Sequence, residues 1–270
     1  MRDKPLGAVG GIIFMMMIIL AILAPLISPY DPITTNVANR LMSPSMTNLM
    51  GTDHLGRDLL SRVIFGAQIS VLVGVAASVI GTLTGGILGL ISGYVGGRFD
   101  MIIQRFLDIL LAFPALILAL AIMAVMGTTV INVIIAISIP FIPRANRVVR
   151  SVALSVKEFQ FVEAATAVGA KPIRIIFVHI LPNTLASYLI IASSLLGSAI
   201  LIEASLSFLG LGIPPPYASW GRSLSEAMTY YIKAPWLAIF PGVAISLAVF
   251  GINLFGDALR DVWDPKLKRI

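Results

Sequence analysis

The 270-residue sequence has no cysteine, only two histidines and only 12% charged residues. Without cysteine, the chain can form neither disulfides nor thiolate metal sites. Soluble domains carry about 25% charged residues, so half that share, with 58% hydrophobic residues, indicates an integral membrane protein. The net charge of +6 fits basic residues kept on the cytoplasmic side of a membrane. No basic run is interleaved with aromatic residues, so we expect no nucleic-acid binding.

Motifs for catalysis and nucleotide binding are also absent. The sequence holds no H-E-x-x-H, no G-x-S-x-G and no G-x-x-x-x-G-K-[ST]. His54 has no second histidine or cysteine nearby that could share a metal ion. We therefore expect no catalytic residue, no metal site and no enzyme activity in this chain. If ATP drives its function, the ATPase is another polypeptide.

Charge-free stretches locate the expected membrane spans, which need about 20 apolar residues each. The first is longer than the apolar part of a signal peptide, so we expect it to remain as an uncleaved span. The stretches are Pro5–Tyr30, Val63–Gly97, Ile109–Pro143, Leu185–Glu203 and Ala234–Gly256.

The third stretch decides the topology, because it can hold one span or two. If the Gly-Thr-Thr at 127–129 is a turn, it holds two short spans, which places 14 Lys and Arg residues inside and 5 outside. A single span would place 13 outside. The positive-inside rule favours two, so we expect an all-α membrane protein with six transmembrane helices and both termini in the cytoplasm.

This topology divides the chain into three regions. We expect a tail and first span at 1–30, an external loop with a surface helix at 31–68, and a five-helix core at 69–270. The core would include a cytoplasmic loop at 151–183, between the fourth and fifth spans.

The second expected span carries glycines at every fourth position. Glycines at this spacing lie along one helix face and let another backbone approach closely. We expect a packed helix contact within the chain or with a partner subunit, although membrane helices also use glycine without such a contact. The residues are Gly81, Gly85, Gly89, Gly93 and Gly97.

Acidic residues are scarce within the spans. Asp108 and Asp257 lie near expected cytoplasmic ends, and Glu203 lies near an external end. None is expected at the bilayer centre, where an acid would indicate a proton or ion relay. A carrier driven by an ion gradient would therefore lack a visible coupling group.

The cytoplasmic loop has the signals of two short helices joined by a sharp corner. Ser155 and Glu158 form an S-x-x-E capping box, which predicts a helix start. Gly169 suits the left-handed position after a helix, and Pro172 suits the first turn of a second helix. Pro182 is expected to end that helix and lead into the fifth span.

The first of these helices has a face of small residues, including Ala164 and Ala165, and one acid, Glu163. Small side chains let a helix lie deep in the groove of another protein. We therefore interpret the pair as a docking element rather than a solvated loop.

The stretch EAATAVGAKPIRIIFVHILP, at 163–182, resembles the conserved cytoplasmic motif of ABC importer permease subunits. The general pattern has isoleucine where this chain has His179, and the peptide-type branch commonly has histidine there. The resemblance implies coupling helices that lie in a cleft of an ATPase subunit. The residues it assigns to coupling are Glu163, Ala164, Ala165, Gly169, His179, Leu181 and Pro182.

Four more stretches are similar to permeases of dipeptide, oligopeptide and nickel importers, so that the resemblance runs from about residue 25 to the end. They are GTDHLGRDLLSRVIFGAQIS (51–70), GYVGGRFDMIIQRFLDILLAFP (93–114), EASLSFLGLGIPPPYASWG (203–221) and GDALRDVWDPKL (256–267). Together they resemble the C-type subunit of the permease pair.

The resemblance implies a multi-pass subunit of the bacterial cytoplasmic (inner) membrane that forms half of a translocation path for peptides or a related small solute. Its partners would be a second related permease, an external substrate-binding protein, membrane lipid and two cytoplasmic ATPases, which would bind ATP and Mg. The alternatives are a stand-alone secondary carrier or channel and a structural membrane scaffold. The substrate stays open among dipeptides, oligopeptides, nickel complexes, glutathione and oligosaccharides.

Two external stretches allow two interpretations each. Asp53 and Thr52 can cap a helix start. The nearby Arg57, Asp58 and Arg62 can mark a surface helix that is either anchored at the membrane interface or in contact with the binding protein. Tyr217 and Trp220, which follow three prolines, are either interface aromatics or part of an external gate or docking ledge.

Overall fold

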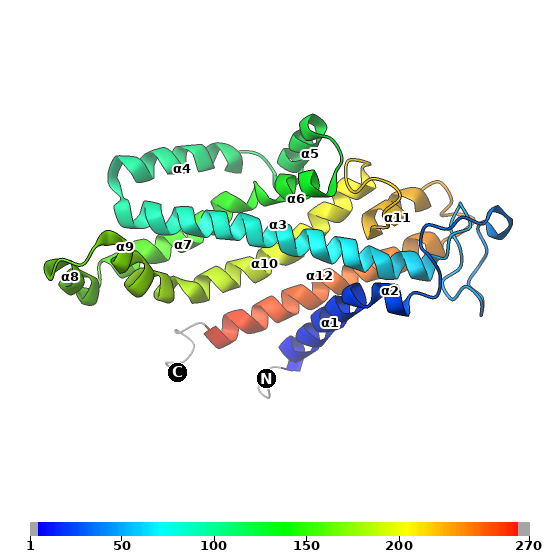
Figure 1. Cartoon of the computed structure of the whole chain (residues 1–270), viewed down its shortest axis with the longest axis horizontal. Helices are drawn as coiled ribbons and strands as arrows, with labels where there is room; N and C mark the ends of the chain where they lie inside the picture. Colours follow the sequence, from blue (N-terminus) through cyan, green and yellow to red (C-terminus); the bar gives the residue numbers. More distant parts are fainter. Residues whose placement is uncertain (1–4, 264–270) are drawn as a thin grey trace.

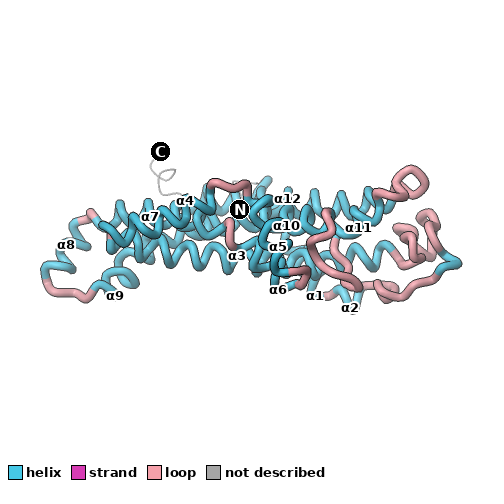
Figure 2. The backbone as a smooth tube through the Cα atoms, turned by 90° about the horizontal axis from the view of Figure 1, so that it is seen from above, coloured by secondary structure: helices cyan, strands magenta, loops and turns pink. Residues whose placement is uncertain are grey.

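The computed structural model describes residues 5–263, and its regular structure is helical apart from one isolated β-bridge between Thr52 and Asp58. Long helices cross the molecule and short ones join them (Figures 1 and 2). The helices are α1 (Pro5–Ile22), α2 (Ala24–Ile27), η1 (Val37–Asn39), α3 (Leu59–Val95), α4 (Gly97–Leu111), α5 (Ala115–Met126), α6 (Val130–Ser138), α7 (Phe141–Lys157), α8 (Gln160–Ala167), α9 (Pro172–Arg174), η2 (Ile175–Ile180), α10 (Leu181–Phe208), α11 (Trp220–Ala227) and α12 (Trp236–Trp263).

Within the described residues, five helical stretches are long and apolar enough to cross a membrane. A sixth span is available if α4 and α5 count as one, although they meet at an angle of 88°. The chain is thus a multi-pass membrane protein with five or six spans. The five stretches are Pro5–Ile22, Leu59–Val95, Val130–Lys157, Pro172–Phe208 and Trp236–Asp261.

The turn expected at 127–129 is present, but the helices around it are longer than the charge-free stretch indicates. Gly127 has a φ of +77°, and the side chain of Thr129 accepts a hydrogen bond from the backbone N–H of Asn132 to cap α6. Helical structure continues past Pro143 to Lys157. Charges do not end this helix, and two arginines of α7, Arg147 and Arg150, pair with acids of α4.

Figure 1 shows which parts of the chain share an end of the molecule. The connection from α3 to α4 and the short helices α8 and α9 lie at one end. The segment 28–58 and α11 lie at the other. Helix α1 begins, and α12 ends, on the side that faces α8.

Helix α3 is central, and it contacts α1, α7 and α10. Its buried residues Val73 and Ala77 join Ile137, Phe141 and Leu195 in an apolar core. Since α5, α6, α7, α10 and Ile213 supply the rest, the core joins segments that are far apart in the sequence.

Four of the glycines in α3 face α6 and α7. A Cβ atom on Gly81 would lie 2.6 Å from the carbonyl oxygen of Ser138, and one on Gly89 would lie 2.7 Å from that of Asn146. Gly85 and Gly93 face α7, so the close contact lies within the chain.

Gly97 does not belong to this glycine face, which corrects the expectation of five. Helix α3 ends at Val95, and Gly97 has a φ of +58°, with no atom within 4 Å of the place that a Cβ atom would take. Its role is to turn the chain into α4, because a left-handed φ favours glycine.

Candidate functional site

The segment between α7 and α10 projects at one end of the molecule (Figure 1). The predicted helix start at Ser155 is wrong, because Ser155 lies in the last turn of α7 and Glu158 follows its end. Helix α8 begins instead at Gln160, after Phe159 in extended conformation. The apolar residues of α7 continue to pack up to Val156, so burial overrides the capping signal.

The corner after α8 has the geometry that the sequence predicts. Gly169 has a φ of +82°, and the N–H of Ala170 donates to the carbonyl of Ala165 at 3.0 Å. Pro172 is in the first turn of α9. A left-handed glycine and a proline that needs no donor therefore set the sharp turn between the two helices.

Pro182 does not end the second helix, which corrects another expectation. The chain stays helical from Pro172 to Phe208, and the turns at Ile175–Ile180 are π-helical. Wider turns of this kind accommodate a backbone position that lacks an N–H donor. The loop element is thus continuous with the spanning helix α10.

Helix α8 has very little packing of its own. Among Gln160–Ala167, all of which the structure describes, Val162 alone is buried. It packs in a cluster with Val156 of α7 and with Ile175 and Ile180 of the next segment. One apolar side chain therefore anchors α8 to both neighbouring helices.

The rest of this element presents exposed apolar side chains, one acid and two bases, Lys171 and Arg174. Phe161 is 43% exposed, Ile173 66% and Val168 85%, and Glu163 and Ala164 are exposed beside them. Large apolar side chains gathered at an exposed site are typical of a protein interaction surface. We call the exposed residues of 159–178 the loop surface.

The remaining residues assigned to coupling lie behind the loop surface. His179 is half-buried, and its ring centroid is 6.1 Å from that of Phe161. Leu181 is half-buried at the start of α10, while Pro182 is exposed. A shallow groove next to α8 is lined by Tyr94, Val95, Lys157, Glu158, Val162, Glu163, Thr166 and Pro172.

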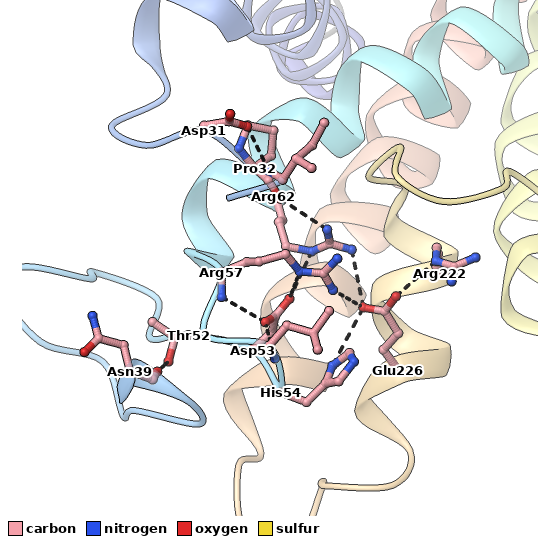
Figure 3. Close-up of polar contacts among 12 residues, drawn as sticks. Asp31, Pro32, Asn39, Thr52, Asp53, His54, Arg57, Arg62, Arg222 and Glu226 are labelled. Atoms are coloured by element: carbon pink, nitrogen blue, oxygen red, sulfur yellow. Dashed lines mark hydrogen bonds and ion pairs between the residues drawn. The ribbon is translucent and has the colours of Figure 1, made fainter. Parts of the chain in front are cut away.

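The opposite end of the molecule is held by a buried ionic network (Figure 3). Arg57 Nε donates to Asp53 Oδ2 at 2.6 Å, and Arg57 Nη2 donates to Glu226 Oε2 at 2.9 Å. Arg62, which is 1% exposed, lies 3.4 Å from Asp53 and 3.3 Å from Glu226. Arg222 binds the other oxygen of Glu226 at 3.0 Å. We call these five residues the external network.

Two residues of the network, Asp53 and Arg57, lie just before α3. Asp58, not Asp53, caps a helix: its side chain accepts from the N–H of Ser61 at 2.8 Å, and α3 then runs unbroken to Val95. Asp53 instead accepts from the N–H groups of Leu55 and Arg57 in the preceding turn. By its position in the sequence, either aspartate could cap a helix. Only the approach of Arg57 and Arg62 to Asp53 decides that Asp58 is the cap.

Burial changes the interpretation of most of the external candidates. Asp53 is 3% exposed, Arg57 8% and Asp58 5%, so these side chains hold this chain together. Trp220 is 2% exposed, and its indole N–H donates to the carbonyl of Val63 at 2.9 Å, which excludes it from the interface belt. Tyr217 is half exposed, and contact with a binding protein stays a prediction for it.

Three donor residues of this region, Asp53, His54 and Glu226, lie close enough to hold a metal ion, with their donor atoms within 4.8 Å of one another. Both carboxylates are already bonded to guanidinium groups. Two buried positive charges would oppose a divalent cation. The donor set therefore fits an ionic network better than a metal centre.

Glu203 is a buried acid whose surroundings the sequence did not reveal. Its side chain is completely buried and accepts hydrogen bonds from Ser70 at 2.8 Å and Ser207 at 2.7 Å. Ser70 comes from α3, so the carboxyl group joins α3 to α10. Only the pairing of distant helices brings these hydroxyl groups together.

The fold and the two polar ends describe a multi-pass membrane protein with an exposed helical element, as expected for a transport permease. Residues 85–269 match the family of binding-protein-dependent transport system inner membrane components. Residues 1–44 match the N-terminal transmembrane domain of oligopeptide transport permease C. The chain therefore belongs to this permease family, and the predicted resemblance is confirmed.

Two relatives are similar over nearly the whole chain. The dipeptide transport system permease protein DppC of Alkalihalophilus pseudofirmus is 45% identical over 268 residues, covering 99% of this chain and 88% of the relative. The glutathione transport system permease protein GsiD of Escherichia coli is 44% identical with the same coverage. The similarity thus extends over both the external network and the loop surface.

Proposed function

We propose that this permease subunit forms half of the path of an ATP-driven importer for short peptides, and that the loop surface couples it to separate ATPase subunits in the cytoplasm. Its partners are then a second permease, two ATPases that bind ATP and Mg, and an external substrate-binding protein. Relatives named for dipeptide and glutathione transport support a short peptide or peptide-like solute.

The observation that carries the coupling proposal is the exposed, weakly anchored helix α8. Its single buried residue, Val162, contacts one cluster shared by α7 and the start of the α9–α10 helix. Both of those helices continue into spans. A displacement of α8 by a bound ATPase would therefore reach two spanning helices directly.

The distribution of charge supports the proposed orientation. Arg98 follows the turn from α3 to α4, Lys157 ends α7, and Lys171 and Arg174 lie at α9, so these four belong to the end that carries the loop surface. The opposite end has an external network in which arginines are paired with acids. By the positive-inside rule, this distribution supports an orientation with α8, the start of α1 and the end of α12 on the cytoplasmic side of the inner membrane.

The test compares two matched glycines. Gly169 and Gly210 both have a φ of +82°, and a Cβ atom on either would have no atom within 4 Å. Alanine at each position costs about 1 kcal/mol of backbone strain. Gly169→Ala should reduce ATPase recovery with the tagged chain and substrate uptake, while Gly210→Ala, at the other end of α10, should reduce neither.

The following outcomes distinguish an importer subunit from a stand-alone secondary carrier. Wild-type chain extracted in mild detergent should bring a second permease and ATPases, identified by mass spectrometry, and Glu163→Lys should release the ATPases. A chain that transports alone, driven by an ion gradient and indifferent to both α8 variants, would contradict the proposal. That result would favour a secondary carrier.

A further inference from the structure

A groove lined by polar residues lies between α7, α10 and α12, within the membrane-spanning part of the chain. Its volume is about 430 Å³. Gly256 lets α12 approach α10 at its floor, because a Cβ atom there would lie 3.0 Å from Ser193 Oγ. It is lined by Val148, Ala186, Ser187, Ile190, Ile191, Ser193, Ser194, Asn253, Gly256, Asp257 and Arg260.

Five polar side chains in this groove have no partner in the described part of the chain. Ser187 and Ser194 of α10, and Asn253, Asp257 and Arg260 of α12, make no side-chain hydrogen bond or ion pair with another described residue. Polar groups left without partners among spanning helices are costly and mark substrate or ion pathways. These groups therefore need water, a solute or polar groups of a partner subunit.

Two arginines of α7 show the contrast. Arg150 binds both carboxylate oxygens of Asp100, and Arg147 binds Asp108 at 2.8 Å. Those pairs join α4 to α7 and are satisfied within the chain. In the groove, the acid Asp257 and the base Arg260 have no partner among the described residues.

A second concavity shows what a lipid-facing groove looks like in this protein. It lies along α1 and is lined by Ala8, Gly11, Ile12, Phe14, Met15, Met16, Ile19 and Phe255, without a charged or hydroxyl side chain. That lining suits an acyl chain. The groove beside α10 combines apolar residues such as Ile190 and Ile191 with hydroxyl, amide and charged side chains, which favours a polar solute over lipid.

We propose that this groove, lined by Ser187, Ser194, Asn253, Asp257 and Arg260, is where the chain contacts the solute in transit, and that the solute is a small zwitterion such as a short peptide. The carboxylate of Asp257 fits an ammonium group, and the guanidinium of Arg260 fits a carboxylate. The hydroxyl and amide groups can bond peptide N–H and C=O groups. This inference rests on the proposed import function.

The absence of cysteine makes the groove directly testable, since any introduced thiol is unique in the chain. Ser194→Cys and Asn253→Cys place thiols in the groove. Ile12→Cys is the matched control, because it is 61% exposed in the apolar groove. Gly10 of α1 lies beside Gly251 of α12, because a Cβ atom on Gly10 would lie 2.7 Å from the carbonyl oxygen of Gly251. Ile12 and Asn253 are each two residues from this contact, so they have a similar depth along the spanning helices.

The complex, purified with its partners and reconstituted in vesicles, is treated with a charged, membrane-impermeant thiol reagent. Both groove thiols should react at least about tenfold faster than the control, because charged reagents are excluded from hydrocarbon. A free dipeptide should slow the reaction at Asn253→Cys. Adding Asp257→Asn should weaken protection by the free dipeptide more than by its N-acetylated form.

Groove thiols that react no faster than Ile12→Cys would overturn the proposal and indicate that lipid or a subunit fills the groove. Fast reaction without protection by any dipeptide tested would overturn solute binding. In both cases, ATPases that still co-purify would leave the import function intact. If no ATPase co-purifies with any variant, the import function itself fails.

Discussion

The two ends of this molecule are stabilised in different ways. At the end that carries the external network, Arg57 and Arg62 are buried and bonded to Glu226 of α11, more than 160 positions away in the sequence. At the other end, α8 depends on Val162 and exposes most of its surface. Segments with few buried contacts open at low free-energy cost, and moving parts are drawn from such segments. The difference supports the proposal that a partner subunit binds the loop surface, while the external network is satisfied within the chain.

The largest effect is expected from breaking the external network. Asp53→Ala removes two turn hydrogen bonds and leaves two buried arginines with one acid fewer, which should cost about 3–5 kcal/mol of unfolding free energy. Thermal unfolding of the purified protein in detergent measures the loss. Asp31→Ala, an exposed acid in the same region, is the control and should have a much smaller effect.

A smaller effect is expected from disturbing the close contact between α3 and α7. A Cβ atom on Gly85 would overlap the backbone oxygen of Ile142, so Gly85→Ala should cost about 1–3 kcal/mol. The neighbouring Gly86→Ala would only meet the ring of Tyr188 at 3.2 Å, which can shift. Equal unfolding midpoints for the two variants would show that α3 and α7 are not packed as described.

Val162→Ala should destabilise α8 locally by about 1 kcal/mol, because it removes methyl groups from the only buried position in the described helix. Cleavage by a protease at 158–171 should increase while the global unfolding midpoint stays close to wild type. Val168→Ala, at an 85% exposed position, should leave the cleavage rate unchanged. A lower global midpoint would mean that the two ends unfold together.

Glu163→Lys should have the smallest effect on stability, since the side chain is exposed and makes no bond to a described residue. The unfolding midpoint should match wild type, while the proposed coupling predicts loss of ATPase recovery and uptake. A variant that unfolds earlier would mean that Glu163 supports the fold, which would contradict an assignment to docking.

Local sequence signals predicted those features that depend on neighbouring residues. Gly169 and Pro172 set the corner after α8, because each fixes its own backbone conformation. The glycines from Gly81 to Gly93 marked a helix face by spacing alone. The same type of reasoning failed where the sequence allows two local conformations. Ser155 has a capping signal but lies in the last turn of α7. Asp53 and Asp58 both suit a helix cap, and only Asp58 is one.

The sequence by itself determined that this chain is a helical membrane protein and that it resembles a peptide-type permease, because composition, hydropathy and motif spacing are properties of the linear chain. Only the tertiary structure decided that Trp220 and Asp53 are buried and that Glu203 accepts hydrogen bonds from two hydroxyl groups. It also decided that Asp257 lies in a groove without a partner among the described residues. The physical reason is that burial and pairing depend on residues from distant helices, whose approach no local pattern encodes.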